Sequence, residues 1–262
     1  MLLQTIITAS IQSGKEILKV YKTDFNVEYK SDESPLTLAD KNAHEVIISF
    51  LRKTDIPVLS EEGRDIPYKE RKHWNKLWIV DPLDGTKEFV KRNDEFTVNI
   101  ALVENGEPVM GVVYAPVLDE LYTGKKGLGS FKAEKASEMQ DIMEIFTDKN
   151  RLPLPAFEKK GYFGIVASRS HLNEETTQFI NEIKKDHDKV KIVSKGSSLK
   201  LCMVAEGAAD IYPRFAPTME WDTAAGDAVV RAAGGKVLIA KTENKLKYNK
   251  ENLLNPWFVV KR

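Results

Sequence analysis

Short apolar segments and amphipathic segments alternate through the second half of the chain. Runs of four or five residues rich in Val, Ile and Tyr are typical of buried strands, and longer stretches with apolar residues three or four apart are typical of helices. This alternation predicts layered α/β structure. The predicted strands are 163–167, 190–194, 209–213, 236–240 and 257–260, and the predicted helices are 172–186, 197–206 and 223–233.

The first half of the chain begins with two predicted helices and continues with strands. Residues 1–22 repeat apolar side chains at helical spacing, which predicts an amphipathic helix packed on the body of the protein. A second helix is expected from Thr37, because Thr-Leu-Ala-Asp at 37–40 resembles a capping box with Asp in place of Glu. The strands that follow are expected to form an antiparallel meander. They are predicted at 56–59, 77–80, 96–103, 109–114 and 120–123.

Residues 136–160 differ in character from the segments on either side. They are rich in charge, contain two prolines and show no sustained period. We interpret them as a variable connection between an N-terminal α+β half, 1–135, and a C-terminal α/β half, 161–262. The predicted fold class is therefore α+β or layered α/β.

The charge and the cysteine content exclude several classes of protein. The 262 residues hold 39 Lys and Arg against 39 Asp and Glu, and a chain without positive excess is a poor nucleic-acid binder. The single cysteine, Cys202, excludes an internal disulfide and a cysteine-rich zinc site, and it favours a reducing, cytoplasmic compartment. No apolar run reaches the roughly 18 residues of a transmembrane helix. For the N-terminal helix, the alternative to packing on the protein is peripheral contact with the cytoplasmic face of the inner membrane. The sequence does not give the oligomeric state.

The segment 81–86, Asp-Pro-Leu-Asp-Gly-Thr, follows the apolar strand 77–80 and is the most informative about chemistry. Pro82 and Gly85 force a turn, which brings to one side two carboxylates that a regular strand would separate. The Leu83 carbonyl between them is freed from sheet pairing and becomes a third oxygen donor. Oxygen ligands of this kind suit Mg²⁺ better than zinc. The alternative is that each aspartate is only a loop residue or a helix cap.

Further acids are candidates for the same cluster. Glu61 and Glu62 follow a short predicted strand, and adjacent carboxylates there repel unless one turns outward or a cation joins them. Asp222 stands before an alanine-rich helix, where a helix N-cap is the alternative. With the two aspartates of 81–86, Glu61 and Asp222 make the acid set that a two-cation phosphate site requires.

Three of these segments resemble the signatures of the inositol monophosphatase superfamily, whose members are Mg²⁺-dependent, lithium-sensitive phosphatases. They are Leu-Ser-Glu-Glu at 59–62, Trp-Ile-Val-Asp-Pro-Leu-Asp-Gly-Thr at 78–86 and Trp-Asp-Thr-Ala-Ala-Gly at 221–226. Within that superfamily, Lys-Glu-Phe at 87–89 is most similar to the bacterial CysQ-type 3′(2′),5′-bisphosphate nucleotidases. The likeness runs from about Lys30 to the C-terminus and is continued at 96–102, 111–116, 168–171, 196–200 and 212–215.

The resemblance implies a fold of alternating α-β-α-β-α layers and a set of metal ligands. The implied ligands are Glu61, Asp81, the Leu83 carbonyl, Asp84 and Asp222. They would hold two or three Mg²⁺ ions, for which Mn²⁺ can substitute. The resemblance further implies that Asp32 and Thr86 activate the attacking water. From the sequence alone, Asp32 is only a charged residue in a polar loop.

Substrate contacts follow from the same resemblance. Backbone N–H groups at 85–86 would hold the phosphate, Lys200 would hold the second phosphate, and Gly196 would let the backbone approach the substrate closely. His171 is equally well explained as a helix cap, and Arg214 as a residue that braces a loop. The full set is Gly85, Thr86, Ser168, His171, Gly196, Lys200 and Arg214.

The implied reaction is Mg²⁺-dependent hydrolysis of the 3′-phosphate of adenosine 3′,5′-bisphosphate to AMP and phosphate, by in-line attack of water, in sulfur assimilation and nucleotide recycling. 3′-Phosphoadenylyl sulfate is a second candidate substrate. An inositol or sugar phosphatase on the same scaffold is one alternative, and a catalytically silent nucleotide-binding module is another. A haloacid-dehalogenase-type phosphatase is disfavoured, because Pro82 stands where its loop needs an aspartate.

Overall fold

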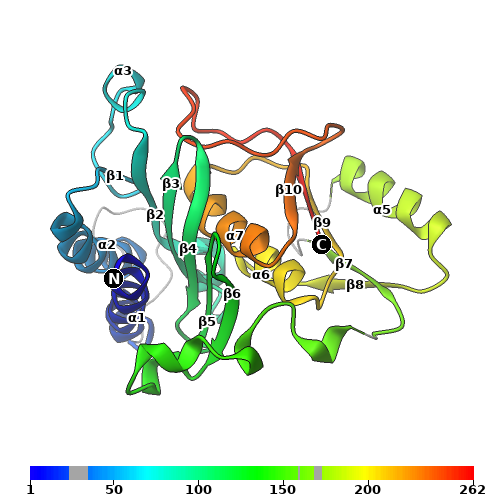
Figure 1. Ribbon diagram of the computed structural model, residues 1–262, viewed down its shortest axis with the longest axis horizontal. Coiled ribbons are helices and arrows are strands. Elements are labelled where there is room, and N and C mark those ends of the chain that lie inside the picture. The colour runs from blue at the N-terminus through cyan, green and yellow to red at the C-terminus, as the bar shows by residue number, and fades with distance from the viewer. Residues whose placement is uncertain (24–34, 159, 168–172) are drawn as a thin grey trace.

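The chain is arranged in five layers of helices and sheets (Figure 1). The structure, a computed structural model, describes residues 1–23, 35–158, 160–167 and 173–262. A pair of helices, a six-stranded sheet, a second pair of helices, a five-stranded sheet and a single helix lie one against the next. The predicted fold of alternating α-β-α-β-α layers is confirmed.

The six-stranded sheet comes from the first half of the chain, with its strands in chain order. From the second strand onward it is the predicted antiparallel meander. The prediction was wrong for the first strand, which runs parallel to the second, because a crossover containing α3 (Tyr68–Arg71) returns the chain between them. The last strand was missed, since 126–134 holds few apolar residues. The strands are β1 (Val58–Ser60), β2 (Lys76–Asp84), β3 (Thr97–Glu104), β4 (Glu107–Ala115), β5 (Glu120–Lys125) and β6 (Gly129–Glu134).

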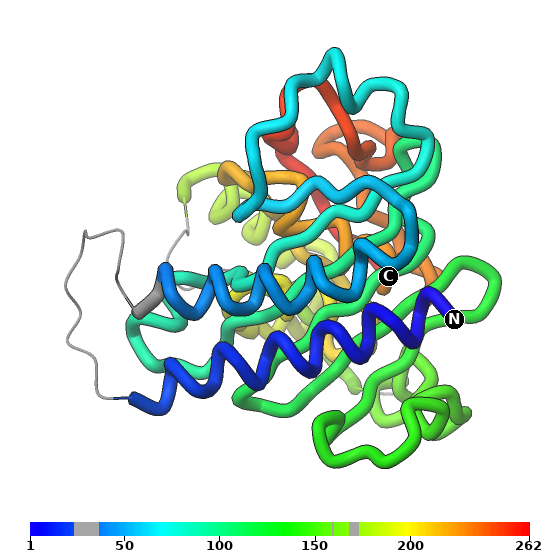
Figure 2. The backbone as a smooth tube through the Cα atoms, turned by 90° about the vertical axis from the view of Figure 1, so that its left-hand side faces the viewer, coloured from blue at the N-terminus to red at the C-terminus, as the bar shows by residue number. Residues whose placement is uncertain are grey.

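Two helices, α1 (Leu2–Tyr21) and α2 (Pro35–Leu51), lie side by side across the outer face of this sheet (Figure 2). The apolar stripe of α1 is buried, as predicted for a helix packed on the protein. Among the residues described, no helix is long and apolar enough to span a bilayer. The capping box expected at 37–40 was wrong, because α2 already begins at Pro35, a residue favoured in the first helical turn.

The middle layer consists of α6 (Leu199–Glu206) and α7 (Glu220–Ala232), which lie between the two sheets. α7 packs closely on β3, β4 and β5 because the sheet presents glycines to it. A Cβ atom on Gly111 would lie 2.6 Å from the Ala225 carbonyl oxygen, and one on Gly124 would lie 2.7 Å from Val229 Cα. This contact sets the position of α7, which begins three residues before the predicted start at 223.

The five-stranded sheet comes from the second half, in the order β10-β11-β9-β7-β8, and α5 (Glu174–Asp186) covers its outer side. β7 is parallel to β8 and β9, and the other pairs are antiparallel. Residues 136–157 connect the two sheets along the chain and contain four short 3-10 helices. The division into halves at 135 and 161 stays a prediction. The strands are β7 (Phe163–Ala167), β8 (Val190–Ser194), β9 (Ile211–Arg214), β10 (Lys236–Ile239) and β11 (Phe258–Lys261).

Candidate active site

β2 carries two carboxylates to the same end of the first sheet by means of a bulge. Asp81 pairs with Asn99 of β3, and Asp84 pairs with Thr97, so β2 has one more residue than β3 between the two pairs. Strand β2 therefore continues to Asp84, past its predicted end at 80. The bulge takes Leu83 out of the regular ladder, and the role of its carbonyl as a third oxygen donor stays a prediction.

Asp81 is the most deeply buried of the candidate ligands. It is 0% exposed, and its Oδ1 accepts the N–H of Leu83 at 3.1 Å. Its Oδ2 has no hydrogen-bond partner among the described residues. A buried carboxylate oxygen without a donor is costly unless a cation occupies the space beside it. The Asp81 carboxylate is therefore well suited to be a metal ligand.

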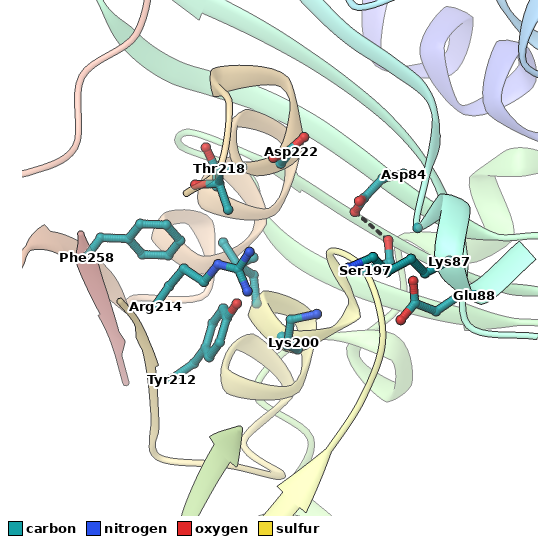
Figure 3. A pocket seen from close by; sticks show the side chains of 13 residues that line it. Asp84, Lys87, Glu88, Ser197, Lys200, Tyr212, Arg214, Thr218, Asp222 and Phe258 are labelled. Atoms are coloured by element: carbon teal, nitrogen blue, oxygen red, sulfur yellow. Dashed lines mark hydrogen bonds between the residues drawn. The ribbon is translucent and has the colours of Figure 1, made fainter. Parts of the chain in front are cut away.

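Hydroxyl and amide donors orient the Asp84 carboxylate. Its Oδ2 accepts hydrogen bonds from Ser198 Oγ at 2.9 Å, from Asn99 Nδ2 at 3.4 Å and from Ser197 Oγ (Figure 3). All three donors approach the same oxygen, which directs Oδ1 to another partner. Sequence reasoning missed the two serines because they were assigned to a helix at 197–206, whereas α6 begins at Leu199.

Acids from three distant stretches of the chain converge. Glu61 follows β1, where its N–H bonds the Val80 carbonyl, and Asp222 lies in the first turn of α7. One carboxylate oxygen each of Glu61, Asp81 and Asp222 lies within 4.8 Å of the others. Asp222 also accepts the Met219 N–H at 2.8 Å. The same side chain therefore both caps the start of α7 and belongs to the acidic cluster. The convergence was predicted; metal binding there stays a prediction.

The cluster cannot hold all of its charge without a counterion. Burial, followed by the charge of Asp84, raises the pKa of Asp222 to about 7. The same two causes raise the pKa of Glu61, and they raise the pKa of Asp81 well above its ordinary value. Closely spaced carboxylates repel, and a divalent cation removes both the repulsion and the cost of dehydration. The donor set, all oxygen, suits Mg²⁺ or Mn²⁺.

Asp40 is a buried acid that sequence reasoning missed. It is 8% exposed, and its Oδ1 has no partner in the described part of the chain. Burial, followed by the charges of Glu62 and Glu61, raises its pKa to about 8. Its burial could have been inferred from the helical spacing, because Asp40 lies on the same buried stripe of α2 as Ala43 and Ile47.

A cavity of about 130 Å³ opens beside the acids, and three basic residues line it: Lys87, Lys200 and Arg214. Figure 3 shows the side chains of Lys200 and Arg214 pointing into it with Asp84 nearby. Lys200 is 8% exposed, and burial lowers its pKa to about 8. Arg214 Nη2 donates to the Pro217 carbonyl at 3.0 Å, so it does brace a loop, while its buried Nε lacks a partner among the described residues. The cavity therefore presents positive charge beside the acidic cluster.

The remaining predicted substrate contacts differ in their placement. Gly85 lines the cavity and has φ +97°, a left-handed conformation that glycine adopts freely. Thr86 begins the short helix α4 (Thr86–Val90) and is exposed. Gly196 is absent from the described cavity lining, where its neighbour Ser197 stands instead. Asp32, Ser168 and His171 lie outside the described residues.

The structure gives a packing reason for glycine at position 196, and the predicted close approach of the substrate there stays a prediction. Its N–H donates to Glu95 Oε2 at 2.8 Å. A Cβ atom at this position would lie 2.7 Å from Glu88 Cγ and 2.8 Å from the Glu95 carbonyl oxygen. Glycine is therefore required to fit the loop before α6 against the segment before β3.

Comparison with known proteins identifies the family. Residues 2–257 match the model of the Inositol monophosphatase family. The chain belongs to this family. It is 46% identical to the 3′(2′),5′-bisphosphate nucleotidase CysQ of Salmonella typhimurium, covering 99% of each chain, and 35% identical to that of Haemophilus influenzae, covering 99% and 92%.

Solved structures are also similar to this chain. CysQ from Bacteroides thetaiotaomicron superposes with a TM-score of 0.92 and 51% identity, covering 99% of this chain and 96% of that one. The extragenic suppressor protein suhB from Bartonella henselae gives 0.72 and 26%, covering 99% and 92%. Membership of the inositol monophosphatase family confirms the resemblance and removes the haloacid-dehalogenase alternative.

Proposed function

We propose that the chain hydrolyses the 3′-phosphate of adenosine 3′,5′-bisphosphate to AMP and phosphate, with 3′-phosphoadenylyl sulfate as a second candidate substrate. The observation that carries the proposal is the juxtaposition of an acidic cluster with a cavity that contains Lys200 and Arg214. Relatives named as 3′(2′),5′-bisphosphate nucleotidases match over nearly the whole chain. The reaction would serve sulfur assimilation and nucleotide recycling.

The cofactor that fits the site is Mg²⁺, in two or three copies, with Mn²⁺ as a substitute. The residues that would hold it are Glu61, Asp81, the Leu83 carbonyl, Asp84 and Asp222. When bound, such ions lower the pKa of a coordinated water and stabilise the oxygen of the leaving group. On the family's precedent, we expect Li⁺ to inhibit.

The chain's own residues orient the substrate and accept a proton. Lys200 and Arg214 would pair with the phosphate that is not cleaved, because both are cationic and both line the cavity. Thr86 would pass a proton to a carboxylate. The resemblance implies Asp32 for that carboxylate. The structure places Asp40 near the cluster, on a helix that packs against α4.

The proposal is tested by Mg²⁺-dependent phosphate release from a panel of esters. Adenosine 3′,5′-bisphosphate is compared with 3′-AMP, inositol 1-phosphate and a sugar phosphate. We expect the highest kcat/KM for the bisphosphate, because only it offers a second phosphate to Lys200 and Arg214. A preference for the inositol or sugar ester would establish the alternative phosphatase. Binding of the bisphosphate with Mg²⁺ but without phosphate release would establish a silent nucleotide-binding module.

We also propose that the protein works in the cytoplasm. Its only cysteine is a buried free thiol, with burial raising the thiol pKa well above its ordinary value. The apolar face of α1 is turned into the protein, which favours the packed helix over contact with the membrane surface. No macromolecular partner is needed for the proposed chemistry.

A further inference from the structure

The first turn of α7, which carries Asp222, is held by a segment from near the C-terminus, residues 249–255. Asn255 N–H donates to the Thr218 carbonyl at 2.8 Å, and Glu220 N–H donates to the Leu253 carbonyl at 3.0 Å. An antiparallel bridge joins the residues between these two bonds. The backbone at the start of α7 is thus fixed by a segment that belongs to neither sheet.

Asn255 makes the contact that leads most directly to the acidic cluster. Its side chain is buried, and Nδ2 donates to the Met219 carbonyl at 2.7 Å and to Thr223 Oγ1 at 3.0 Å. Met219 in turn donates its N–H to Asp222 Oδ2 at 2.8 Å. Asn255 therefore holds the residue whose N–H orients the Asp222 carboxylate.

Glu220 supplies the second half of this contact. It is 0% exposed, and its carboxylate accepts hydrogen bonds from Asn249 N–H at 2.5 Å and Lys250 N–H at 2.9 Å. Lys250 Nζ completes the ion pair at 2.6 Å, and it also lies 3.3 Å from Asn255 Oδ1. Lys250 thus links Glu220 to Asn255. A buried charge of this kind tolerates little movement, because a displaced partner would leave it unpaired.

We propose that Glu220, Lys250 and Asn255 form a clamp of positioning residues that orients Asp222 for cation binding. The proposal rests on the proposed function, in that Asp222 is taken as a cation ligand. The Asp222 carboxylate accepts the Met219 N–H, and one of its oxygens lies within 4.8 Å of a carboxylate oxygen of Glu61 and of Asp81. A small rotation of the first turn of α7 would leave the Asp222 carboxylate intact but turn it away from Glu61 and Asp81.

The test measures Mn²⁺ binding to the full-length protein without substrate, by electron paramagnetic resonance or calorimetry. Asn255→Ala removes the contact with Met219, and Lys250→Met removes the cation from Glu220. We expect the Kd for Mn²⁺ to rise about 10-fold or more in each variant, as is usual when a residue that supports a ligand is lost. We also expect kcat to recover at saturating metal, since no ligand has been removed.

Asp227→Asn is the matched control, because Asp227 is a buried acid of the same helix outside the cluster. Its carboxylate bonds Arg231 Nε at 2.6 Å and the Tyr248 hydroxyl at 2.9 Å. The control should lower Tm and leave the Mn²⁺ Kd unchanged. A purely structural role for the clamp predicts the same behaviour in Asn255→Ala and Lys250→Met, and that result would overturn the proposal.

The two levels of inference fail in different ways. If the unaltered protein binds no Mn²⁺, both the metal site and the clamp are wrong. If it binds Mn²⁺ and the clamp variants bind equally well, the clamp alone is wrong. Should Asn255→Ala fail to fold, Lys250→Met decides the question, because Lys250 is partly exposed and Glu220 keeps its two backbone donors.

Discussion

At the scale of single residues, sequence reasoning found the acids that stand beside a strand end or a helix start. Glu61 and Asp81 stand out because each interrupts or follows a buried apolar strand. Asp40 was missed because an acid inside a helical pattern has several ordinary explanations, and only the packing of α2 shows it to be buried. The hydroxyls around Asp84 were missed for a similar reason, since they come from a loop distant in sequence.

Replacing Asp84 tests the metal-ligand assignment directly. Asp84→Asn keeps the size of the side chain, and the hydroxyls of Ser197 and Ser198 can still donate to its amide oxygen. The substitution removes the negative charge of a proposed metal ligand. We expect kcat to fall at least about 10²-fold in a steady-state phosphate-release assay, with little change in Tm. Asp210→Asn, which alters an acid bonded to Gly164 N–H and Lys160 outside the cavity, is the control. Near-normal turnover in Asp84→Asn would contradict the site.

The proton-accepting carboxylate is decided by comparing Asp40→Asn with Asp32→Asn. Asp40 has a buried, unpartnered oxygen in the described structure and lies close enough to Glu61 and Glu62 to feel their charge. We therefore expect Asp40→Asn to lower kcat at least about 10²-fold, in line with the loss of a general base. Asp32→Asn should cost less than a factor of about 10. The reverse order would support the role that the resemblance implies for Asp32.

At the scale of elements, periodicity found most helices and strands but misplaced their ends. Asp222 was expected before α7 or as its N-cap, but the N-cap is Met219, and Asp222 lies in the first turn with its carboxylate bonded to the Met219 N–H. β2 continues beyond its expected end because a bulge lets Pro82 lie within a strand. Neither outcome is visible in a local pattern, since the start of α7 is bonded to residues 253–255 and the end of β2 is paired with β3.

The contact between α7 and the first sheet gives a test at this scale. Gly111→Ala would place a Cβ atom 2.6 Å from the Ala225 carbonyl oxygen, so α7 must move. We expect a loss of about 1–3 kcal/mol in the free energy of unfolding, measured with denaturant, together with weaker Mn²⁺ binding because Asp222 moves with its helix. Gly127→Ala is the control: a Cβ atom there would meet nothing within 4 Å, and the φ of +81° strains alanine, so this variant should lose stability but leave Mn²⁺ binding unchanged. Equal metal affinity in both variants would contradict this coupling.

At the scale of the whole molecule, the layered fold was predictable because strands and helices alternate, while the parallel pairing of β1 was not. The order of strands in the second sheet also could not be derived, since β11 inserts between β9 and β10 from the far end of the chain. The general rule is that sequence patterns report which faces are buried. They do not report which distant segment covers them.

The acidic cluster makes the stability of the whole protein depend on pH and on metal. Asp222 and Asp40 have pKa values of about 7 and about 8, above those of the unfolded chain. Between pH 6.5 and 8 the unfolded chain therefore binds fewer protons than the folded one at these sites, and the free energy of unfolding falls as pH rises. We expect Tm in EDTA to fall across this range. Mg²⁺ should raise Tm more at pH 8 than at pH 6.5, because ligands must be deprotonated to bind. A Tm in EDTA that rises over this range would contradict the assignment.

The position of α7 between the sheets has a consequence for the order in which the protein matures. A nascent chain that has emerged as far as β6 already presents Glu61, Asp81 and Asp84, but Asp222 and the segment 249–255 that holds it are synthesised much later. Divalent ions therefore cannot template the early sheet through the complete site. Under the proposed ligand assignment, the ion can be captured by the complete site only after Asp222 and residues 249–255 have been made, so we expect metal loading to be a late step of assembly.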